Sequence, residues 1–106
     1  MAKPRIDGIY ELGHVLYALD AEAHGFTRGD IERVESFWIF SDMHASSAGF
    51  ELVLRDGRRA YVDFQHWHGF EQEEDFRVEA TFTPPDKEPP GGWSSDVARL
   101  NRMLAA

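Results

Sequence analysis

The sequence predicts an α+β fold: a four-stranded antiparallel sheet connected as a meander, with an N-terminal helix, a short helical turn and a C-terminal helix packed on one face. Three observations predict it. Residues 50–67 read FELVLRDGRRAYVDFQHW, two alternating runs joined at Asp56-Gly57, which is typical of a β-hairpin. Apolar residues recur at helical spacing near both ends of the chain. The 106 residues are 42% hydrophobic, which suits one core and a single domain over 1–106.

The first helix is expected over residues 8–24, with Asp7 as its N-cap and Gly25 as its left-handed stop. Gly13 lies inside this helix and marks a close packing contact. The buried stripe is formed by apolar residues three and four positions apart: Ile9, Leu12, Leu16, Leu19 and Ala23.

A short helical turn over 28–33 is expected next, because Thr27 and Asp30 resemble a capping box with an acid in place of the usual Glu. The first strand is expected over 34–41. Both parities of its FWIF segment (37–40) are apolar, which predicts a strand that is central or covered on both faces.

The register of the central hairpin follows from its charges. A two-residue loop would place Leu54 opposite Arg59, an apolar group beside a charge. A three-residue loop with Gly57 in the left-handed region pairs Leu52 with Ala60 instead, so we expect a type I turn with a G1 bulge. The inward residues are then Phe50, Leu52, Leu54, Ala60, Val62 and Phe64.

The fourth strand is expected over 76–83, and its inward residues are Phe76, Val78, Ala80 and Phe82. A Pro/Gly-rich connector, 84–93, follows. Ser94 or Ser95 is then expected to cap a final helix, with Asp96 near its N-terminus. The buried stripe of that helix is Val97, Leu100, Met103 and Leu104. Trp38 is expected in the core, and Trp93 is expected to anchor the last helix against the sheet.

Composition restricts the function. The formal charge of −8 disfavours nucleic acid, and the acidic excess is usual for a solubilising surface. The absence of cysteine excludes disulfides and thiolate chemistry and fits a cytoplasmic location. No run is long enough to cross a bilayer, so no membrane association is expected. No G-x-S-x-G, P-loop or G-x-G-x-x-G motif is present, so no catalytic activity is expected.

Two histidines form a candidate metal site. His66 and His68 lie two positions apart, so on a strand both imidazoles share a face and can reach one divalent ion. A nearby carboxylate would complete the site. The alternative is that His66 continues the buried parity after Phe64 and lies at the rim of the core.

Three arginines, Arg55, Arg58 and Arg59, form the one basic concentration of the chain, at the hairpin tip. They predict a weak, salt-sensitive nucleic-acid contact, or else ion pairs of Arg59 with Asp56 or Glu51. The helix–strand–strand–strand–helix order is similar to that of the double-stranded RNA-binding domain. That family meets phosphates with a lysine-rich first turn of its last helix, whereas the corresponding Ser94-Ser95-Asp96 carries no lysine and a fourth strand is added.

The remaining candidate surface is the polar sheet face together with the acidic segment that precedes the fourth strand. Its predicted binding residues are Tyr61, Trp67, Glu71, Glu73, Glu74 and Asp75. Exposed aromatic rings beside carboxylates are typical of a surface that meets a protein partner. The leading hypothesis is therefore a small acidic binding or adaptor module with an unknown protein partner. Self-association as a homodimer, through this face or an exposed edge strand, is equally compatible.

Overall fold

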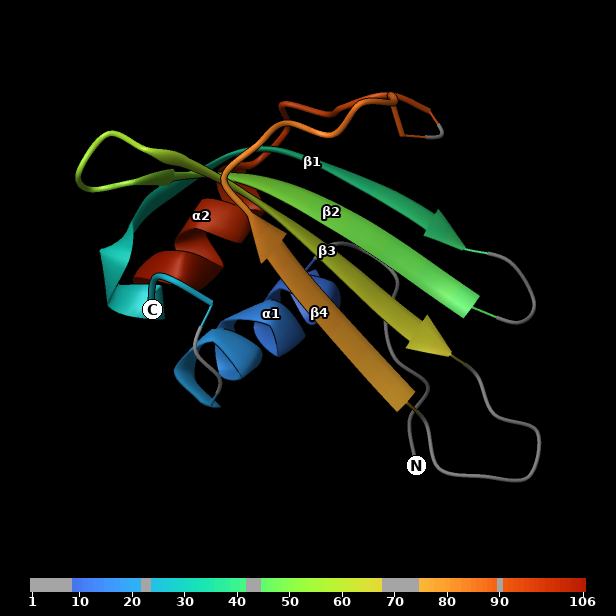
Figure 1. Cartoon of the computed structure of the whole chain (residues 1–106), viewed down its shortest axis with the longest axis horizontal. Helices are drawn as coiled ribbons and strands as arrows, with labels where there is room; N and C mark the ends of the chain where they lie inside the picture. Colours follow the sequence, from blue (N-terminus) through green and yellow to red (C-terminus); the bar gives the residue numbers. More distant parts are fainter. Residues whose placement is uncertain (1–8, 22–23, 42–44, 68–74, 90) are drawn as a thin grey trace.

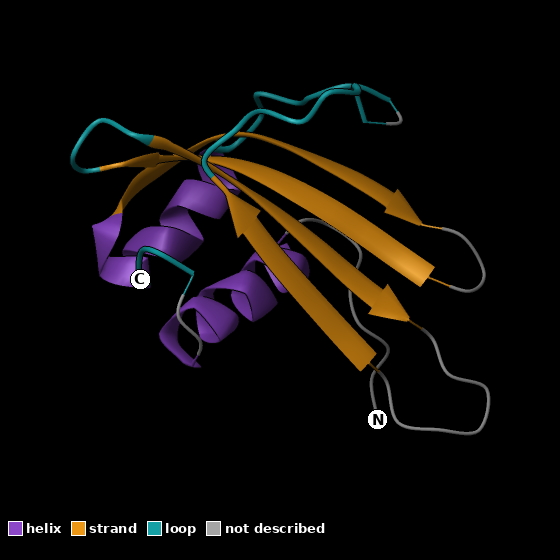
Figure 2. Cartoon of the chain, viewed as in Figure 1, coloured by secondary structure: helices purple, strands orange, loops and turns teal. Residues whose placement is uncertain are grey.

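The computed structural model describes residues 9–21, 24–41, 45–67, 75–89 and 91–106. The elements in chain order are α1 (Ile9–Ala21), the 3₁₀ turn η1 (Arg28–Asp30), β1 (Ile31–Ser41), β2 (Ala45–Leu54), β3 (Arg59–Trp67), β4 (Asp75–Thr81) and α2 (Ala98–Ala105). The strands form an antiparallel sheet in the order β1-β2-β3-β4, and both helices lie on one face of it (Figures 1 and 2). The predicted α+β meander is confirmed. Neither described helix is both long and apolar enough to cross a membrane.

Helix α1 packs through the predicted apolar stripe, of which Leu12, Leu16 and Leu19 are buried, together with Val15. Ala23 and the proposed N-cap Asp7 lie outside the described residues. Gly13 is the predicted close contact, since a Cβ there would lie 3.0 Å from Cε of Met103 on α2. Gly25 has the expected left-handed φ of +91°, but α1 is described only to Ala21 and His24 is not helical, so the helix does not run to residue 24 as predicted.

The turn after α1 is shorter than predicted. The carboxylate of Asp30 accepts hydrogen bonds from the backbone N–H of Thr27 at 2.9 Å and from its hydroxyl at 3.2 Å, as the capping pattern indicated. Only Arg28–Asp30 is helical, and β1 begins at Ile31 instead of residue 34.

Strand β1 is an edge strand, so the prediction of a central position is wrong. The pairing of β1 with β2 shifts register twice, between Ile31 and Arg33 and between Val34 and Ser36. Each shift adds one residue to β1, so at the start of this strand the inward residues are three positions apart and not two. The inward set is Ile31, Val34, Phe37 and Ile39, all buried in or packed against the core. The second apolar parity of the FWIF segment faces outward.

The β2–β3 register agrees with the prediction: Leu52 pairs with Ala60. Leu54 donates its N–H to the carbonyl of Arg58 and accepts from the N–H of Gly57, which closes a three-residue turn. Gly57 has a φ of +93°. The core below this hairpin is formed chiefly by Phe50, Leu52, Leu54, Ala60, Val62, Phe64 and residues of the helices.

Strand β4 ends at Thr81, two residues earlier than expected. Val78 and Ala80 pack against the core as predicted. The prediction that Phe82 is an inward strand residue is wrong: the chain has left the sheet there, and Phe82 is 43% exposed. Its ring packs edge-on against Phe26 at 5.9 Å and lies under the guanidinium of Arg58.

The connector after β4 lies along the outer sheet face, opposite the helices (Figure 2). It reaches β1, where Ser94 and Phe37 exchange backbone hydrogen bonds of 2.7 and 3.0 Å. Helix α2 then starts at Ala98, so neither Ser94 nor Ser95 is its N-cap. Its predicted stripe is confirmed: Leu100 is buried, and Val97, Met103 and Leu104 pack against the core.

Asn101 ties α2 to β1. Its Oδ1 accepts the N–H of Val34 at 2.8 Å, and its Nδ2 donates to the carbonyl of Val34 at 3.1 Å. The side-chain amide thus replaces a neighbouring strand at this point of the sheet edge, and nothing in the sequence pattern indicated it.

Replacing Gly57 with Ala should lower the free energy of unfolding by about 1 kcal/mol, because φ stays positive. No atom lies within 4 Å of the added Cβ, so the cost is one of backbone conformation alone. Urea denaturation measures it. Gly29→Ala, at an exposed glycine without a positive φ, is the control and should change stability much less. Equal stabilities of the Gly57 variant and the wild type would contradict the turn.

Replacing Asn101 with Ala should cost about 1–3 kcal/mol in urea denaturation, because two backbone groups of Val34 lose their partner. The loss should exceed the gain in helix propensity that Ala brings. Arg102→Ala, at the exposed neighbouring position, should leave stability nearly unchanged. A neutral Asn101 variant would show that the amide does not hold the edge.

Candidate functional site

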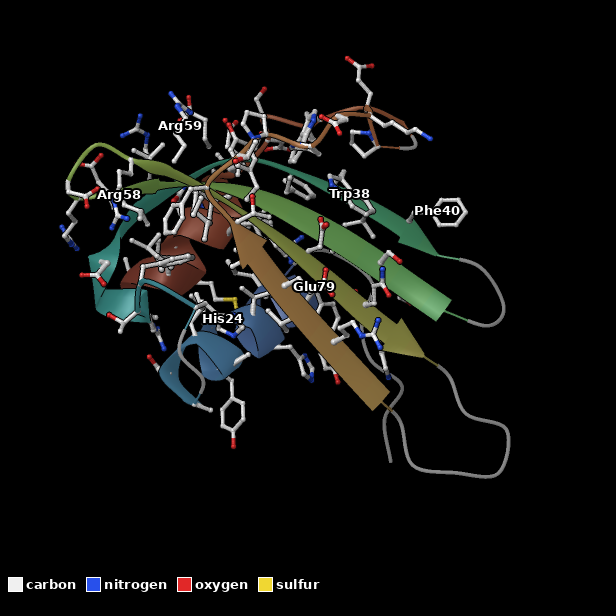
Figure 3. The ribbon with its side chains drawn as sticks, in the orientation of Figure 1. His24, Trp38, Phe40, Arg58, Arg59 and Glu79 are labelled. Atoms are coloured by element: carbon white, nitrogen blue, oxygen red, sulfur yellow. The ribbon has the colours of Figure 1, made fainter. Side chains whose placement is uncertain are left out.

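The outer face of the sheet is the candidate site. Its outward residues form three rows that cross the strands from β1 to β4: Ser36–Glu51–Tyr61–Thr81, Trp38–Gly49–Asp63–Glu79 and Phe40–Ser47–Gln65–Arg77. The connector lies over Ser36, Glu51 and Tyr61 of the first row, and its residues also border Asp63 in the second row. We call the second and third rows the open face. Figure 3 labels Trp38, Phe40 and Glu79 on it.

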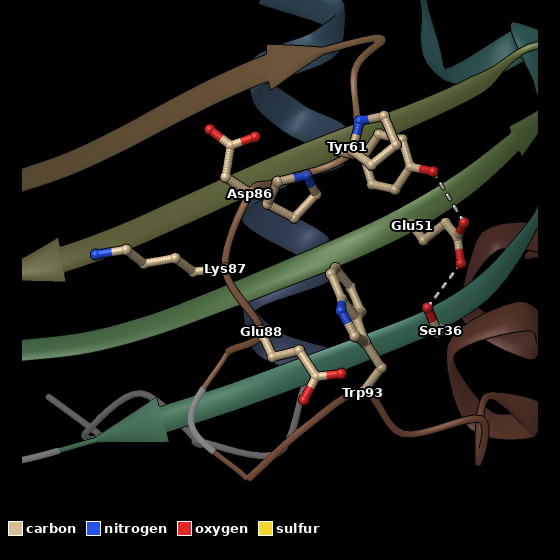
Figure 4. Close-up of a pocket in the computed structure, with 9 residues that line it drawn as sticks. Ser36, Glu51, Tyr61, Asp86, Lys87, Glu88 and Trp93 are labelled. Carbon is tan, nitrogen blue, oxygen red and sulfur yellow. Dashed lines mark hydrogen bonds between the residues drawn. The ribbon is translucent and has the colours of Figure 1, made fainter.

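The first row is held together by one carboxylate. Glu51 accepts hydrogen bonds from the hydroxyl of Ser36 at 2.9 Å and the hydroxyl of Tyr61 at 3.2 Å (Figure 4). It also accepts one from the guanidinium of Arg59 at 3.2 Å. Loss of hydration raises the pKa of Tyr61, and the charge of Glu51 raises it further. Tyr61 is therefore a neutral donor, half-buried under the connector, and not an exposed platform.

Two hollows open beside the connector. The first has a volume of about 400 Å³ and is lined on the sheet by Ser36, Glu51 and Tyr61. The second has a volume of about 260 Å³ and is lined on the sheet by Tyr61, Asp63 and Thr81. Connector residues form the other wall of each hollow. Trp93 lines both hollows, so the residue predicted to anchor α2 against the sheet lies over the outer face, opposite that helix.

Trp38 dominates the second row. Its indole lies over Gly49, and a Cβ at that glycine would overlap the indole nitrogen. The expectation that Trp38 is a core residue is wrong: the side chain is half-buried on the outer face, because the bulges of β1 set its parity. Phe40, two residues on, is 46% exposed. The open face thus carries two aromatic rings along β1.

Two carboxylates stand opposite each other in the same row. Asp63 of β3 and Glu79 of β4 are cross-strand partners, and like charges in that arrangement destabilise a sheet. Within the described part of the chain neither takes part in an ion pair. Loss of hydration raises the pKa of Asp63, and the negative charge of Glu79 raises it further.

Of the two predicted metal ligands, His66 and His68, the structure describes the first alone. His66 is 1% exposed on the inner face, as the alternative reading expected, and His68 lies outside the described residues. Among the described residues no group of three His, Cys, Asp or Glu side chains is arranged to hold a metal ion. Ser46 of β2, the cross-strand partner of His66, is also buried, as is Glu11 of α1.

Each of the three arginines at the hairpin tip contacts another group of the same chain. Arg59 contacts Glu51, as expected; Arg58 pairs instead with Asp56 at 2.7 Å. Arg55 donates to the carbonyl of Gly29 at 3.0 Å. The N–H and guanidinium of Arg58 lower the pKa of Asp56, which keeps that carboxylate charged. Figure 3 shows Arg58 and Arg59 at this end of the sheet.

The predicted acidic segment is only partly placed. Glu71, Glu73 and Glu74 lie outside the described residues. The backbones of Trp67 and Asp75 are cross-strand partners at the end of β3 and the start of β4, and their side chains are not described.

No protein-family model, no curated protein and no solved structure matches this chain. The site therefore has to be interpreted from its own chemistry. The open face offers aromatic rings, an indole donor and carboxylate acceptors, which together suit the recognition of a cationic segment. The alternation of the sequence is enough to place Asp63 and Glu79 on one face of the sheet. The face on which Trp38 lies could not be predicted without knowing the bulges of β1.

Asp63→Asn should stabilise the protein at pH 7. The pKa of the Asp63 carboxyl is higher in the folded than in the unfolded state, so the ionised carboxylate lowers the free energy of unfolding. This cost disappears as the pH falls below the folded-state pKa and then below the unfolded-state pKa. The advantage of the variant in urea denaturation should therefore shrink toward zero below about pH 3.8. Asp20→Asn, at an exposed position on α1, is the matched control. An advantage that does not depend on pH would contradict the assignment.

Proposed function

We propose that the protein is a non-enzymatic binding module whose open face holds a basic, extended segment of a protein partner. The observation that carries the proposal is the Asp63–Glu79 pair, two facing carboxylates without an ion pair in the described part of the chain, beside the half-buried indole of Trp38.

The repulsion between the two carboxylates favours the binding of a cationic side chain that a partner supplies. A lysine or arginine placed between Asp63 and Glu79 relieves their mutual repulsion and gains charge-assisted hydrogen bonds. The apolar stem of that side chain packs on a ring such as Trp38 or Phe40, and its charge interacts with the ring face. Gly49 leaves room for the indole, since a Cβ at this position would overlap the ring.

The charge of the whole chain supports the same partner. A formal charge of −8 attracts a basic segment from a distance and raises its association rate. Glu71, Glu73 and Glu74, which lie outside the described residues, and Trp67 and Asp75, whose side chains are not described, belong to this proposal by their residue types alone. The absence of cysteine is consistent with action in the cytoplasm.

A titration followed by ¹H–¹⁵N NMR tests the proposal, with an alternating (Lys-Thr)₄ peptide as the probe and (Glu-Thr)₄ as the matched acidic peptide. The basic peptide should shift the indole N–H of Trp38 and amides of residues 47–49, 63–65 and 77–79, whereas the acidic peptide should not. The double variant Asp63→Asn/Glu79→Gln should weaken binding about tenfold.

The control is Asp20→Asn/Asp96→Asn, which removes the same charge at two exposed positions outside the open face. Its Kd for the basic peptide should stay within about twofold of the wild-type value, because the peptide interacts with the charges of the open face and not with the total charge of the protein. Equal weakening by the two double variants, or shifts confined to another surface, would contradict the proposal.

A further inference from the structure

The two edges of the sheet differ in how their backbone groups are satisfied. On β1, Val34 is bonded through both N–H and carbonyl by Asn101, and Phe37 by Ser94. The two bulges distort this edge further. Such devices are how natural sheets prevent an edge from pairing with another chain.

Strand β4 has none of these devices in the described part of the chain. It pairs with β3 from Asp75 to Thr81 without a register shift, and no described strand or isolated bridge lies on its other side. A regular, uncovered edge of this kind is a template for another strand.

The outward charges of β4 are self-complementary. Arg77 and Glu79 are exposed, two residues apart and on the same face, and neither forms an ion pair within the described residues. An edge that repelled every incoming strand would carry charges of one sign. These charges instead suit an antiparallel copy of the same strand.

We propose that β4 pairs with the β4 strand of a second copy, antiparallel and with the two-fold axis through Val78, which joins the two sheets into one. In this register Arg77 stands opposite Glu79 of the partner subunit, twice per dimer. Centring the pair on residue 77 would place Arg77 against itself, and centring it on residue 79 would do the same with Glu79. Charge therefore selects the Val78 register.

Dimerisation also reduces the repulsion between the carboxylates of Asp63 and Glu79. Arg77 of the partner subunit extends the second row next to Glu79, and thus neutralises one member of the Asp63–Glu79 pair. The half-buried Val78 and Ala80 gain neighbours on the inner face. Because the axis is perpendicular to the sheet, both open faces lie on the same side. The inference does not rest on the proposed docking of a basic segment.

Analytical ultracentrifugation from about 1 µM to 1 mM tests it, because seven residues a side make a small interface and a weak dimer. The wild type should show a concentration-dependent monomer–dimer equilibrium. Arg77→Glu or Glu79→Arg alone turns two attractive pairs into two repulsive ones and should raise the dimer Kd about tenfold. The double variant Arg77→Glu/Glu79→Arg restores opposite charges and should recover the wild-type Kd.

Arg102→Glu, an exposed charge reversal on α2, is the matched control and should leave the dimer Kd unchanged. Circular dichroism confirms that each variant is folded. Hydrogen exchange gives an independent readout: amides of β4 should be better protected at high concentration, and those of β1 should not change. A protein that stays monomeric throughout, or a dimer equally strong in the single and double charge variants, would overturn the proposal.

Discussion

The register between β2 and β3 is the constraint on which the rest of this structure depends. Side chains alternate between the two faces of a strand, so the three-residue turn ending at Gly57 decides at once which residues form the core and which face outward. A slip by one residue would bury Asp63 and expose Val62. The hydrophobic core and the candidate site are therefore two consequences of one pairing, and the positive φ of a single glycine helps to maintain it.

A second constraint comes from the way the chain closes the β1 edge. The connector lies along the outer face, pairs with β1 through Ser94, and places α2 on the inner face, where Asn101 completes the bonding of Val34. This arrangement protects one sheet edge from foreign strands, and it also covers one end of the outer face. The open face and the uncovered β4 edge are what this closure leaves accessible.

Carboxylates on the same sheet face have opposite roles because of their neighbours. Glu51 receives three hydrogen bonds and stabilises the covered row. Asp63 and Glu79 face each other across two strands, and neither forms an ion pair in the described part of the chain. Satisfied polar networks hold a structure together, whereas unsatisfied charges favour a ligand or partner that neutralises them. This contrast separates the structural end of the face from the end that we assign to recognition.

By itself, the sequence determined the α+β meander, the hairpin register, the stripe of each helix and the alternation that places Asp63 and Glu79 together. These features follow from local periodicity and turn chemistry, which involve residues close in the chain. The tertiary structure decided the inward set of β1, the outer positions of Trp38 and Trp93, the burial of Tyr61 and the start of α2. Each depends on a contact between distant segments, as when Asn101 binds Val34 across 67 positions, and no local pattern encodes such a contact.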